Sequence, residues 1–434
     1  MLYKHLLGDA LLLVGFTALA GSVACSAQQS KPQPLPYASI GAATYDGPNR
    51  GSSYDLKGPM IRIGLLAPLH GPEEPAGQAM VAAAKLALQD ASRVSWPDGR
   101  ELTLDTVDTS VPPWGALGDE IIRMVIQEKV VAIITSANAV SAHLSEQIGT
   151  KIGVPVLTMS SDPTTTEIHL PWIFRMGPSD KQQARLIAQK LYQEDGMHQV
   201  LLVSEMGQDG CAGATAFRRA AHRLGAPPPI SFVVNPSQPD PDHLLGLIRA
   251  DFPQALVLWT GPHEASQVIP LVRRAGNGAV IYLCQAAAQA GSGVAFRPSD
   301  AAFQPARPGD QASVVVSRQW GNRPELPFAR RYGAEMGRQP TPVAAETYDA
   351  VTLIAQALRR AGPNRARLRD QLAAVQGFHG ASGLISFDNQ GNNRATLKLI
   401  ILRLFKRPET KADARPVSDF EAFSSKKELL GRTE

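Results

Sequence analysis

Short apolar segments alternate with helical patterns along most of this chain, and this alternation is the feature that most restricts its fold. Apolar runs typical of strands lie at 61–69, 130–136 and 154–159, and a further strand with alternating polarity is expected at 101–108. Segments with apolar residues at helical spacing separate them, at 76–93, 116–129 and 142–152. Strands that alternate with helices of this length favour a parallel sheet covered by helices on both faces. The pattern predicts an α/β protein of the doubly wound type.

The same alternation starts again after Ser179. Each expected helix now precedes an expected strand, with helices at 181–194, 212–224, 241–251 and 264–275, and strands at 199–204, 230–234, 255–260 and 279–284. A second doubly wound lobe therefore follows the first. The last third is expected to hold a Pro- and Ala-rich loop at 291–311, a strand at 312–317, helices at 326–336, 342–360 and 365–376, and a hairpin at 383–404 that turns at 389–392.

The first 25 residues have the pattern of an export signal. Lys4 gives a positive start, residues 10–20 are apolar, and small residues lead to Cys25. The apolar run is too short to span a bilayer comfortably. Cys25 stands where a bacterial lipoprotein signal places the cysteine that is lipidated after cleavage. The alternative is ordinary signal-peptide cleavage, after Ala20 or Ala24.

Composition excludes several functional classes. The net charge is +4 without a dense basic block, so nucleic-acid binding is not expected. No later stretch is apolar for about eighteen residues, so no transmembrane helix is expected. Residues 26–58 are rich in Pro, Gly, Ser and Gln and are interpreted as a flexible linker, and residues 406–434 as a loose charged tail.

Motifs that would indicate an enzyme or a metal protein are missing. The chain has no Gly-x-Ser-x-Gly elbow, no Gly-x-x-x-x-Gly-Lys loop and no His-Glu-x-x-His helix. Ser424 and Lys427 match Ser-x-x-Lys, but they lie in the charged tail. We therefore expect no catalytic residues, no cofactor and no metal. The exported compartment would permit a disulfide between Cys211 and Cys284, but no motif requires one.

Several stretches together resemble a known family. They are IRIGLLAPLHGPEEPAGQAMVAAAKLALQD, VVAIITSANAVSA, VPVLTMSSDPTTTEI with WIFRMGPSD, and YDAVTLIAQALRRAG with the segment that ends in GLISFDNQGNN. Their order and spacing resemble the type I periplasmic binding proteins, specifically the group that binds leucine, isoleucine, valine and related amino acids for ABC transporters. The resemblance implies two lobes joined by three crossing segments, near 174–179, 314–320 and 376–380. It divides the chain into residues 59–176 with 318–376 and residues 177–317 with 377–405.

The ligand is expected between the lobes. In open α/β sheets, ligands bind where strands end and helix N-termini offer unpaired N–H groups. The loops at these places are rich in hydroxyl, amide and acidic side chains, and they lie at 70–77, 136–141, 160–166, 205–213 and 261–264. Hydroxyls and N–H groups suit a carboxylate, and an acid suits an ammonium group.

The resemblance assigns candidate ligand contacts within these loops. It places Ser136 at a serine that contacts the ligand carboxylate, and Ser161 and Asp162 where the family grips the amino-acid backbone. Asp209 falls at a frequent tyrosine, and Glu264 lies close to the ammonium-binding glutamate. The same loops add Asn138, Ser160 and Thr164 as candidates.

Each candidate also has a structural alternative. The residues at 136–138 and 160–166 are typical of helix caps, and Glu264 would stabilise a helix start through the macrodipole. Asp209 would also suit a solvated loop. His70 is interpreted as a loop residue.

The departures from the family pattern point to an unusual ligand. Asp162 adds negative charge where the family has threonine, and Ala76 and Asp209 lack the aromatic rings found in other members. The cleft should be more open and more acidic, so the ligand is expected to differ from a plain branched-chain amino acid, for example by an extra amine.

The functional prediction is an exported, monomeric, periplasmic solute-binding protein. It would close its lobes on a small amino-acid-like ligand and present the closed form to an ABC transporter permease. The alternative is a lipid-anchored interaction or sensor protein on the same fold that binds a protein partner.

Overall fold

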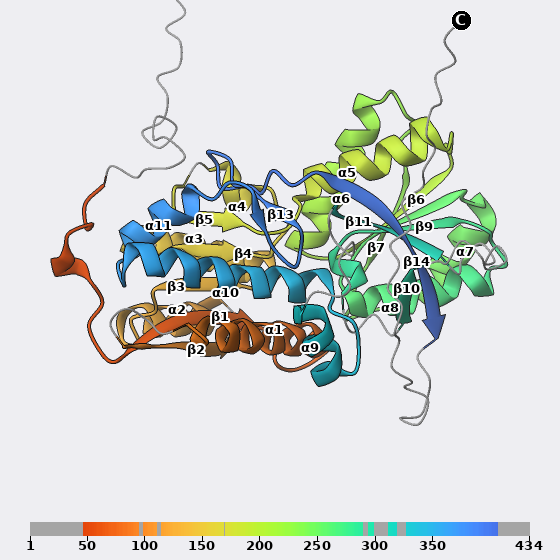
Figure 1. Cartoon of the computed structure of the whole chain (residues 1–434). Helices are drawn as coiled ribbons and strands as arrows, with labels where there is room; N and C mark the ends of the chain where they lie inside the picture. The colour runs from red at the N-terminus through yellow and green to blue at the C-terminus, as the bar shows by residue number, and fades with distance from the viewer. Residues whose placement is uncertain are drawn as a thin grey trace, which may run out of the picture.

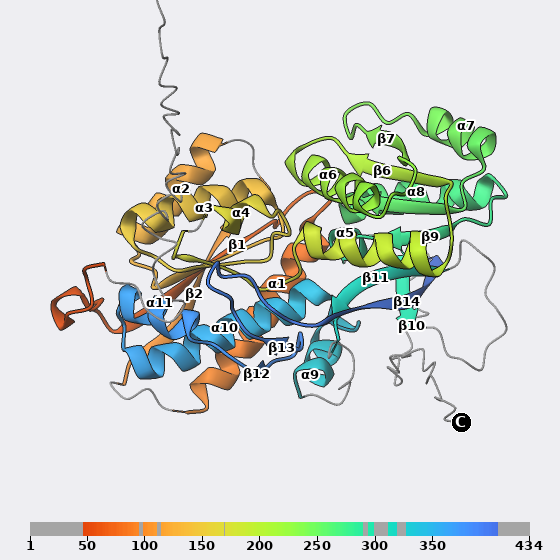
Figure 2. The same cartoon turned by 90° about the horizontal axis from the view of Figure 1, so that it is seen from above.

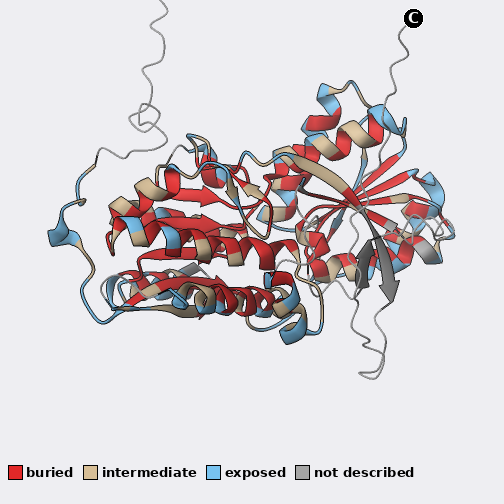
Figure 3. Cartoon of the chain, viewed as in Figure 1, coloured by how far each residue is buried: buried red, intermediate tan, exposed pale blue. Residues whose placement is uncertain are grey.

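The computed structural model describes residues 47–94, 99–110, 114–168, 170–289, 294–298, 311–318 and 327–406. These residues form two lobes, each built around a β-sheet with helices packed against it (Figures 1 and 2). Buried residues concentrate in the two sheets and on the inner faces of the helices (Figure 3). The structure confirms the α/β class and the two lobes expected from the sequence.

The first lobe contains a five-stranded parallel sheet in the order β2-β1-β3-β4-β5. Its strands are β1 (Met60–Ala67), β2 (Glu101–Asp108), β3 (Ala132–Thr135), β4 (Val156–Thr158) and β5 (Ile173–Arg175). Side chains alternate between the two faces of a strand, so Ile63 and Leu65 join one core and Leu66 joins another. Because both faces are covered, the central strands are mostly apolar, whereas the edge strand β2 alternates in polarity.

Helices from distant parts of the sequence cover this sheet. One core includes residues of α1 (Glu74–Ser92), α10 (Pro342–Ala361) and α11 (Arg365–Ala373). The other core includes residues of α2 (Trp114–Ile126), with α3 (Ala139–Ile152) packed against it. The short helices α4 (Thr164–Glu167) and α9 (Pro327–Met336) complete the lobe, α9 against α1 and α10.

The second lobe contains a seven-stranded sheet in the order β10-β14-β11-β9-β8-β6-β7. Five strands are parallel: β6 (Val200–Glu205), β7 (Ile230–Val234), β8 (Ala255–Trp259), β9 (Val280–Leu283) and β11 (Gln311–Ser317). The long strand β14 (Leu397–Lys406) runs antiparallel between β11 and β10 (Val294–Pro298). The helices are α5 (Asp180–Ala188), which continues as a π-helical turn at Gln189–Glu194, α6 (Gln208–Arg223), α7 (Pro241–Asp251) and α8 (Pro262–Arg274).

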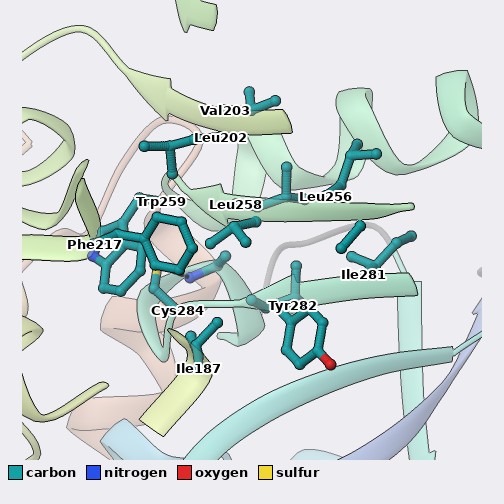
Figure 4. Close-up of a cluster of buried hydrophobic side chains, with 14 of the residues drawn as sticks. Ile187, Leu202, Val203, Phe217, Leu256, Leu258, Trp259, Ile281, Tyr282 and Cys284 are labelled. Atoms are coloured by element: carbon teal, nitrogen blue, oxygen red, sulfur yellow. Dashed lines mark hydrogen bonds between the residues drawn. The ribbon is translucent and has the colours of Figure 1, made fainter. Parts of the chain in front are cut away.

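The core of this lobe brings an aromatic cluster to the end of the sheet that faces the first lobe. Phe217 of α6 packs on Trp259 with ring centroids 6.2 Å apart, and Cys284 lies nearby (Figure 4). A Cβ at Gly213 would come within 1.8 Å of the Trp259 ring, so α6 approaches this ring closely only because residue 213 is glycine. The Trp259 Nε1 donates to Asp180 Oδ1 at 3.0 Å, which holds the indole in place.

Two expectations about the last third of the chain were wrong. Residues 383–404 do not form one continuous hairpin: residues 388–392 form a turn with Gly391 at φ 79°, and Phe387 and Asn393 form an antiparallel bridge beside it, but the pairing ends there. The strand before the turn, β13 (Leu384–Ile385), pairs with β12 (Phe378–His379), whereas β14 joins the second sheet. The segment expected to be a loop at 291–311 contains β10, which pairs with β14.

The third crossing between the lobes also differs from expectation. The second lobe was expected to resume at residue 377, but Ile385 and Phe387 belong to the core of the first lobe, and the chain enters the second sheet at Leu397. The first crossing lies between β5 and α5, within 174–179 as expected. The crossing expected at 314–320 lies partly outside the described residues.

Residues 47–58 are not a free linker as expected. Arg50 Nε donates to Asp370 Oδ2 at 2.7 Å, and Arg367 Nη2 donates to Asp55 Oδ1 at 2.8 Å. The backbone N–H of Leu56 donates to the carbonyl of Pro363 at 2.8 Å. We call residues 47–56, which include a 3₁₀ turn at Ser52–Tyr54, the N-terminal strap. It ties the chain to the end of the first lobe, in red in Figure 1.

Several expectations lie outside the described residues. These are the export signal at 1–25 with Cys25, the linker as far as residue 46, and the tail from residue 407 onward. Within the described ranges, no helix has the length and apolar character needed to cross a membrane.

Candidate functional site

A pocket lies between the lobes, where strands of both sheets end. The first lobe contributes the loops after β1, β3 and β4 and parts of α1 and α10, and the second lobe contributes the loops after β6, β8 and β9. The polar and charged side chains that line it are Glu73, Ser136, Asn138, Ser161, Glu205, Asp209, Thr260 and Gln289. The centres of water-sized molecules can occupy about 60 Å³ of it, which is room for about five waters or for a ligand of a few heavy atoms.

Three carboxylates from both lobes converge on Gly261 at one side of the pocket. A Cβ built at Gly261 would lie 2.9 Å from Glu264 Oε2, 3.3 Å from Glu205 Oε2 and 3.8 Å from Glu73 Oε1. Glu73 belongs to the first lobe, and the other two belong to the second. The absence of a side chain at Gly261 therefore allows acids from opposite lobes to approach one another.

The convergence of these three glutamates disfavours their charged forms. Burial raises the pKa of Glu205 to about 7, and Glu264 and Glu73 act in the same direction. The N–H of Gly261, which donates to Glu205 Oε2 at 2.6 Å, opposes the shift only partly. Glu73 is exposed as a residue, but loss of water around its carboxylate and the charge of Glu264 raise its pKa. A bound cation would relieve this repulsion.

No positive side chain among the described residues balances these acids inside the pocket. Among the described residues that line it, none is lysine, arginine or histidine. Nor do the described residues include a group of three or more His, Cys, Asp or Glu side chains placed to hold a metal ion. Hydrogen-bond acceptors and hydroxyls share the lining with apolar side chains, among them Met80, Trp259 and Val343.

Four of the eight residues predicted from the sequence line the pocket: Ser136, Asn138, Ser161 and Asp209. The capping alternative also applies to Asn138, whose side chain caps α3 by accepting from the Ser141 N–H. Ser136 Oγ lies 3.3 Å from Ser141 Oγ, and Ser141 belongs to the first turn of the same helix.

Asp209 connects the two lobes directly. The N–H of Ala139, at the start of α3, lies 3.1 Å from Asp209 Oδ1 and 3.2 Å from Oδ2. Burial raises the pKa of Asp209 well above its usual value despite this hydrogen bond, and the charges of Glu205, Asp180 and Asp162 add to the shift. Asp209 is thus a contact between lobes and not a solvated loop residue.

Asp162 and Thr164 lie beside the pocket and do not line it. The His143 Nε2 is 3.3 Å from Asp162 Oδ2, and Gln208 of the second lobe donates to the same oxygen at 2.9 Å. Hydrogen bonds to Asp162 and Glu146 raise the pKa of His143 to about 9. Burial alone would raise the pKa of Asp162, but hydrogen bonds from His143, Gln208 and Thr164 lower it overall. A protonated His143 therefore neutralises the charge that made Asp162 unusual in the sequence.

The buried side chain of Arg175 shapes the loop at 160–166. Its guanidinium donates to the carbonyls of Ser160 and Asp162 and to the hydroxyls of Thr165 and Thr166. Ser160 is fully buried in this loop, outside the pocket lining. Glu264 also lies outside the lining, but its carboxylate completes the cluster at Gly261.

Sequence reasoning did not single out Glu73, Glu205 or Trp259. The signal was present for the two glutamates, because both stand in loops that were expected to line the site. Trp259 ends strand β8, so its position at the carboxyl end of a strand was also available. The convergence at Gly261 depends on how the lobes face each other, which the sequence does not specify.

The two described cysteines do not form a disulfide: Cys211 is exposed and Cys284 is buried beside the pocket, and both are free. His70 lies in an exposed loop where it contacts Asp108, as the loop interpretation expects. Ala76, which lacks the expected aromatic ring, does line the pocket.

Comparisons with known proteins agree with this geometry. A leucine-binding protein from Thermotoga maritima superposes with a TM-score of 0.67 at 20% identity, covering 78% of this chain and 95% of that one. A branched-chain amino-acid-binding protein from Streptococcus pneumoniae in complex with isoleucine gives 0.66 at 20% identity, covering 80% and 100%. A solute-binding protein from R. palustris in complex with benzoate gives 0.67 at 18% identity, covering 78% and 92%. No curated protein matches the chain in sequence.

These structural likenesses establish the fold, and the family is established from the sequence. The family model described as periplasmic binding protein matches residues 60–408, which include all of both sheets. Proteins of this family bind solutes and are not enzymes, which agrees with the missing catalytic motifs. This chain belongs to the periplasmic binding protein family.

Proposed function

We propose that this protein is an exported solute-binding protein that captures a small, amine-bearing polar ligand between its lobes and delivers it to an ABC transporter. The observation that carries the proposal is the pocket in which Glu73 of one lobe meets Glu205 and Glu264 of the other at Gly261. An ammonium group placed there would contact carboxylates of both lobes at once. Contacts made only when both lobes touch the ligand are what drive hinge closure.

Known relatives of the fold support the general role. The structures to which the chain is similar include a leucine-binding protein, an isoleucine complex and a benzoate complex of transporter-associated binding proteins. All three ligands carry a carboxylate. The acidic lining of this pocket argues against a plain branched-chain amino acid as the ligand, because a carboxylate would meet like charges.

Export and anchoring belong to the same proposal. The signal at 1–25 would direct the chain to the periplasm, and Cys25 would carry a lipid if the signal is of the lipoprotein type. The protein is expected to act as a monomer. Mass spectrometry of the mature N-terminus distinguishes lipidation of Cys25 from cleavage after Ala20 or Ala24.

A thermal-unfolding screen of the mature protein tests the proposal. The panel contains amines, amino acids, small amides, organic acids and alcohols. A ligand at a hundred times its dissociation constant stabilises the folded state by about 2.7 kcal/mol, which raises Tm by a few degrees in a chain of this size. A reproducible shift with one chemical class supports solute binding. No shift with any class, for protein shown to be folded and ligand-free, would contradict it and favour the partner-binding alternative.

A further inference from the structure

The N-terminus of α3 is an anion-binding position at the border of the pocket. The helix spans Ala139–Ile152, and its first turn follows directly after the loop that contains Ser136 and Asn138. The first N–H groups of a helix have no partner within the helix, and the macrodipole adds partial positive charge there. Such a position attracts a carboxylate or another anion.

This position is already occupied by a carboxylate of the protein itself. Both oxygens of Asp209 lie within 3.2 Å of the Ala139 N–H. The neighbouring Gln208 donates to Asp162 at 2.9 Å, so α6 of the second lobe contacts the first lobe through two consecutive residues. These two contacts fix the Asp209 carboxylate at the α3 N-terminus.

The remaining free space is suited to the opposite charge. Glu205 and Glu73 line the same pocket as Asp209, and Glu264 adjoins them at Gly261. A ligand carboxylate would find the helix N-terminus taken and four acids around it. An ammonium group would find acceptors on both lobes, and Trp259, which lines the pocket, offers an aromatic ring for a cation.

We propose that Asp209 takes the place of a ligand carboxylate, and that the pocket is therefore specific for compact aliphatic amines that carry no carboxylate. This inference rests on the proposed function and narrows its ligand class. Asp209 acts as a specificity-determining residue in two ways: it blocks the anion position, and it offers a carboxylate to a cation that binds beside it. The available room, for about five waters, fits a short amine.

Matched pairs of ligands that differ only in the carboxylate test the inference. The pairs are leucine with 3-methylbutylamine, ornithine with butane-1,4-diamine, and lysine with pentane-1,5-diamine. Isothermal titration calorimetry of the wild-type protein is expected to give at least tenfold tighter binding for the amine of one or more pairs. An amino acid that binds more tightly than its amine partner in every pair that binds would overturn the inference while leaving the solute-binding function intact. If folded protein binds no compound of either class, the proposed function fails as well.

Variants distinguish a specific effect of the Asp209 side chain from the effect of removing any negative charge from its lobe. Asp209→Asn keeps an acceptor for the Ala139 N–H but removes the charge, and Asp209→Gly vacates the anion position. Both are expected to reduce the preference for the amine at least tenfold, and Asp209→Gly to gain affinity for the amino acid. Asp242→Asn is the control, because Asp242 is an exposed acid in the first turn of α7, in the same lobe. Equal ligand preference in the Asp209 and Asp242 variants would overturn the role of Asp209. Circular dichroism verifies that each variant is folded.

Discussion

Glu346 is a carboxyl group buried between the lobes, and its ionisation should control stability. It lies on α10, and its Oε1 accepts from Gln285 Nε2 of the second lobe at 2.8 Å. Burial raises its pKa to about 8, and the nearby Asp349 acts in the same direction although Gln285 opposes the shift. The folded protein therefore holds a proton that the unfolded chain releases near pH 4.5. Stability from this group is complete at low pH and falls as pH rises from about 4.5 to about 8.

Replacing Glu346 with glutamine should remove this pH dependence. Glu346→Gln keeps an acceptor for Gln285 but cannot ionise. We compare the free energy of unfolding of the variant with that of wild type. This difference should be more favourable to the variant at pH 8.5 than at pH 5, by on the order of 2–4 kcal/mol. Urea unfolding followed by tryptophan fluorescence at both pH values measures the difference. Glu335→Gln, at an exposed position of α9, serves as control. Parallel pH profiles for wild type and Glu346→Gln would contradict the expectation.

Glu205 should make ligand binding depend on pH. Burial and the charges of Glu264 and Glu73 raise its pKa to about 7, and the hydrogen bond from the Gly261 N–H opposes this shift. Asp209 lines the same pocket. A cation binds the ionised form, so amine affinity should rise about tenfold between pH 6 and pH 8. Calorimetry in buffers of different ionisation enthalpy measures both the affinity and the released protons. Glu205→Gln should bind more weakly and with a flatter profile. An affinity that falls with rising pH would exclude this role.

At the scale of single elements, the close approach of α6 to Trp259 depends on Gly213. Gly213→Ala would place a methyl group 1.8 Å from the indole, and either the helix or the ring would have to move. We expect a loss of about 1–3 kcal/mol in stability and weaker ligand binding, because Trp259 lines the pocket. Gly246→Ala on α7 is the matched control, since a Cβ there meets nothing within 4 Å. The control should gain up to about 1 kcal/mol from helix propensity. Denaturant unfolding of both variants measures these changes in stability, and equal stabilities for the two variants would contradict the role of Gly213.

Elements with strong local patterns could be predicted from the sequence. The parallel strands and long helices of both lobes carry apolar periodicity that reflects burial in the fold, and their ends fall within a few residues of expectation. The failures occur where pairing is non-local. β10 is short and contains Pro298, and it exists because β14 passes beside it. The turn at 388–392 was found, but its local signal could not reveal that the flanking strands enter different sheets.

In the site too, local features could be predicted from the sequence and non-local contacts could not. The loops were predictable because strand ends in α/β sheets are local features, and four of the predicted residues do line the pocket. The roles of Asp162 and Asp209 could not be predicted, because each depends on a partner from another part of the chain, His143 with Gln208 for the first and Ala139 for the second.

At the scale of the whole molecule, a few polar contacts hold the lobes together. Asp209 with Ala139 and Gln208 with Asp162 are two of these contacts, and Gln285 with Glu346 is a third; Gln285 directly follows Cys284, which lines the pocket. A single hydrogen bond of this kind contributes about 0.5–1.5 kcal/mol net, more to a charged acceptor. Changes of that size shift the balance between open and closed forms several-fold.

Loss of the Gln208 contact should open the ligand-free molecule. We expect Gln208→Ala to increase the radius of gyration measured by small-angle X-ray scattering, and saturating ligand to reverse the increase. Gln127→Ala, at an exposed position of the first lobe, should scatter like wild type. If Gln208→Ala and wild type give identical scattering without ligand, this contact does not hold the lobes closed.

The N-terminal strap determines which lobe receives a pulling force that is applied to the N-terminal part of the chain. Residues 47–56 are fixed to α11 and its preceding loop, at the end of the first lobe away from the second (Figure 1). Tension from an attachment upstream therefore passes into the first lobe and does not pull across the crossing segments. With such an attachment the first lobe would be the stationary part and the second would be free to swing, so we expect a molecule immobilised by its N-terminus to open and close as it does in free solution.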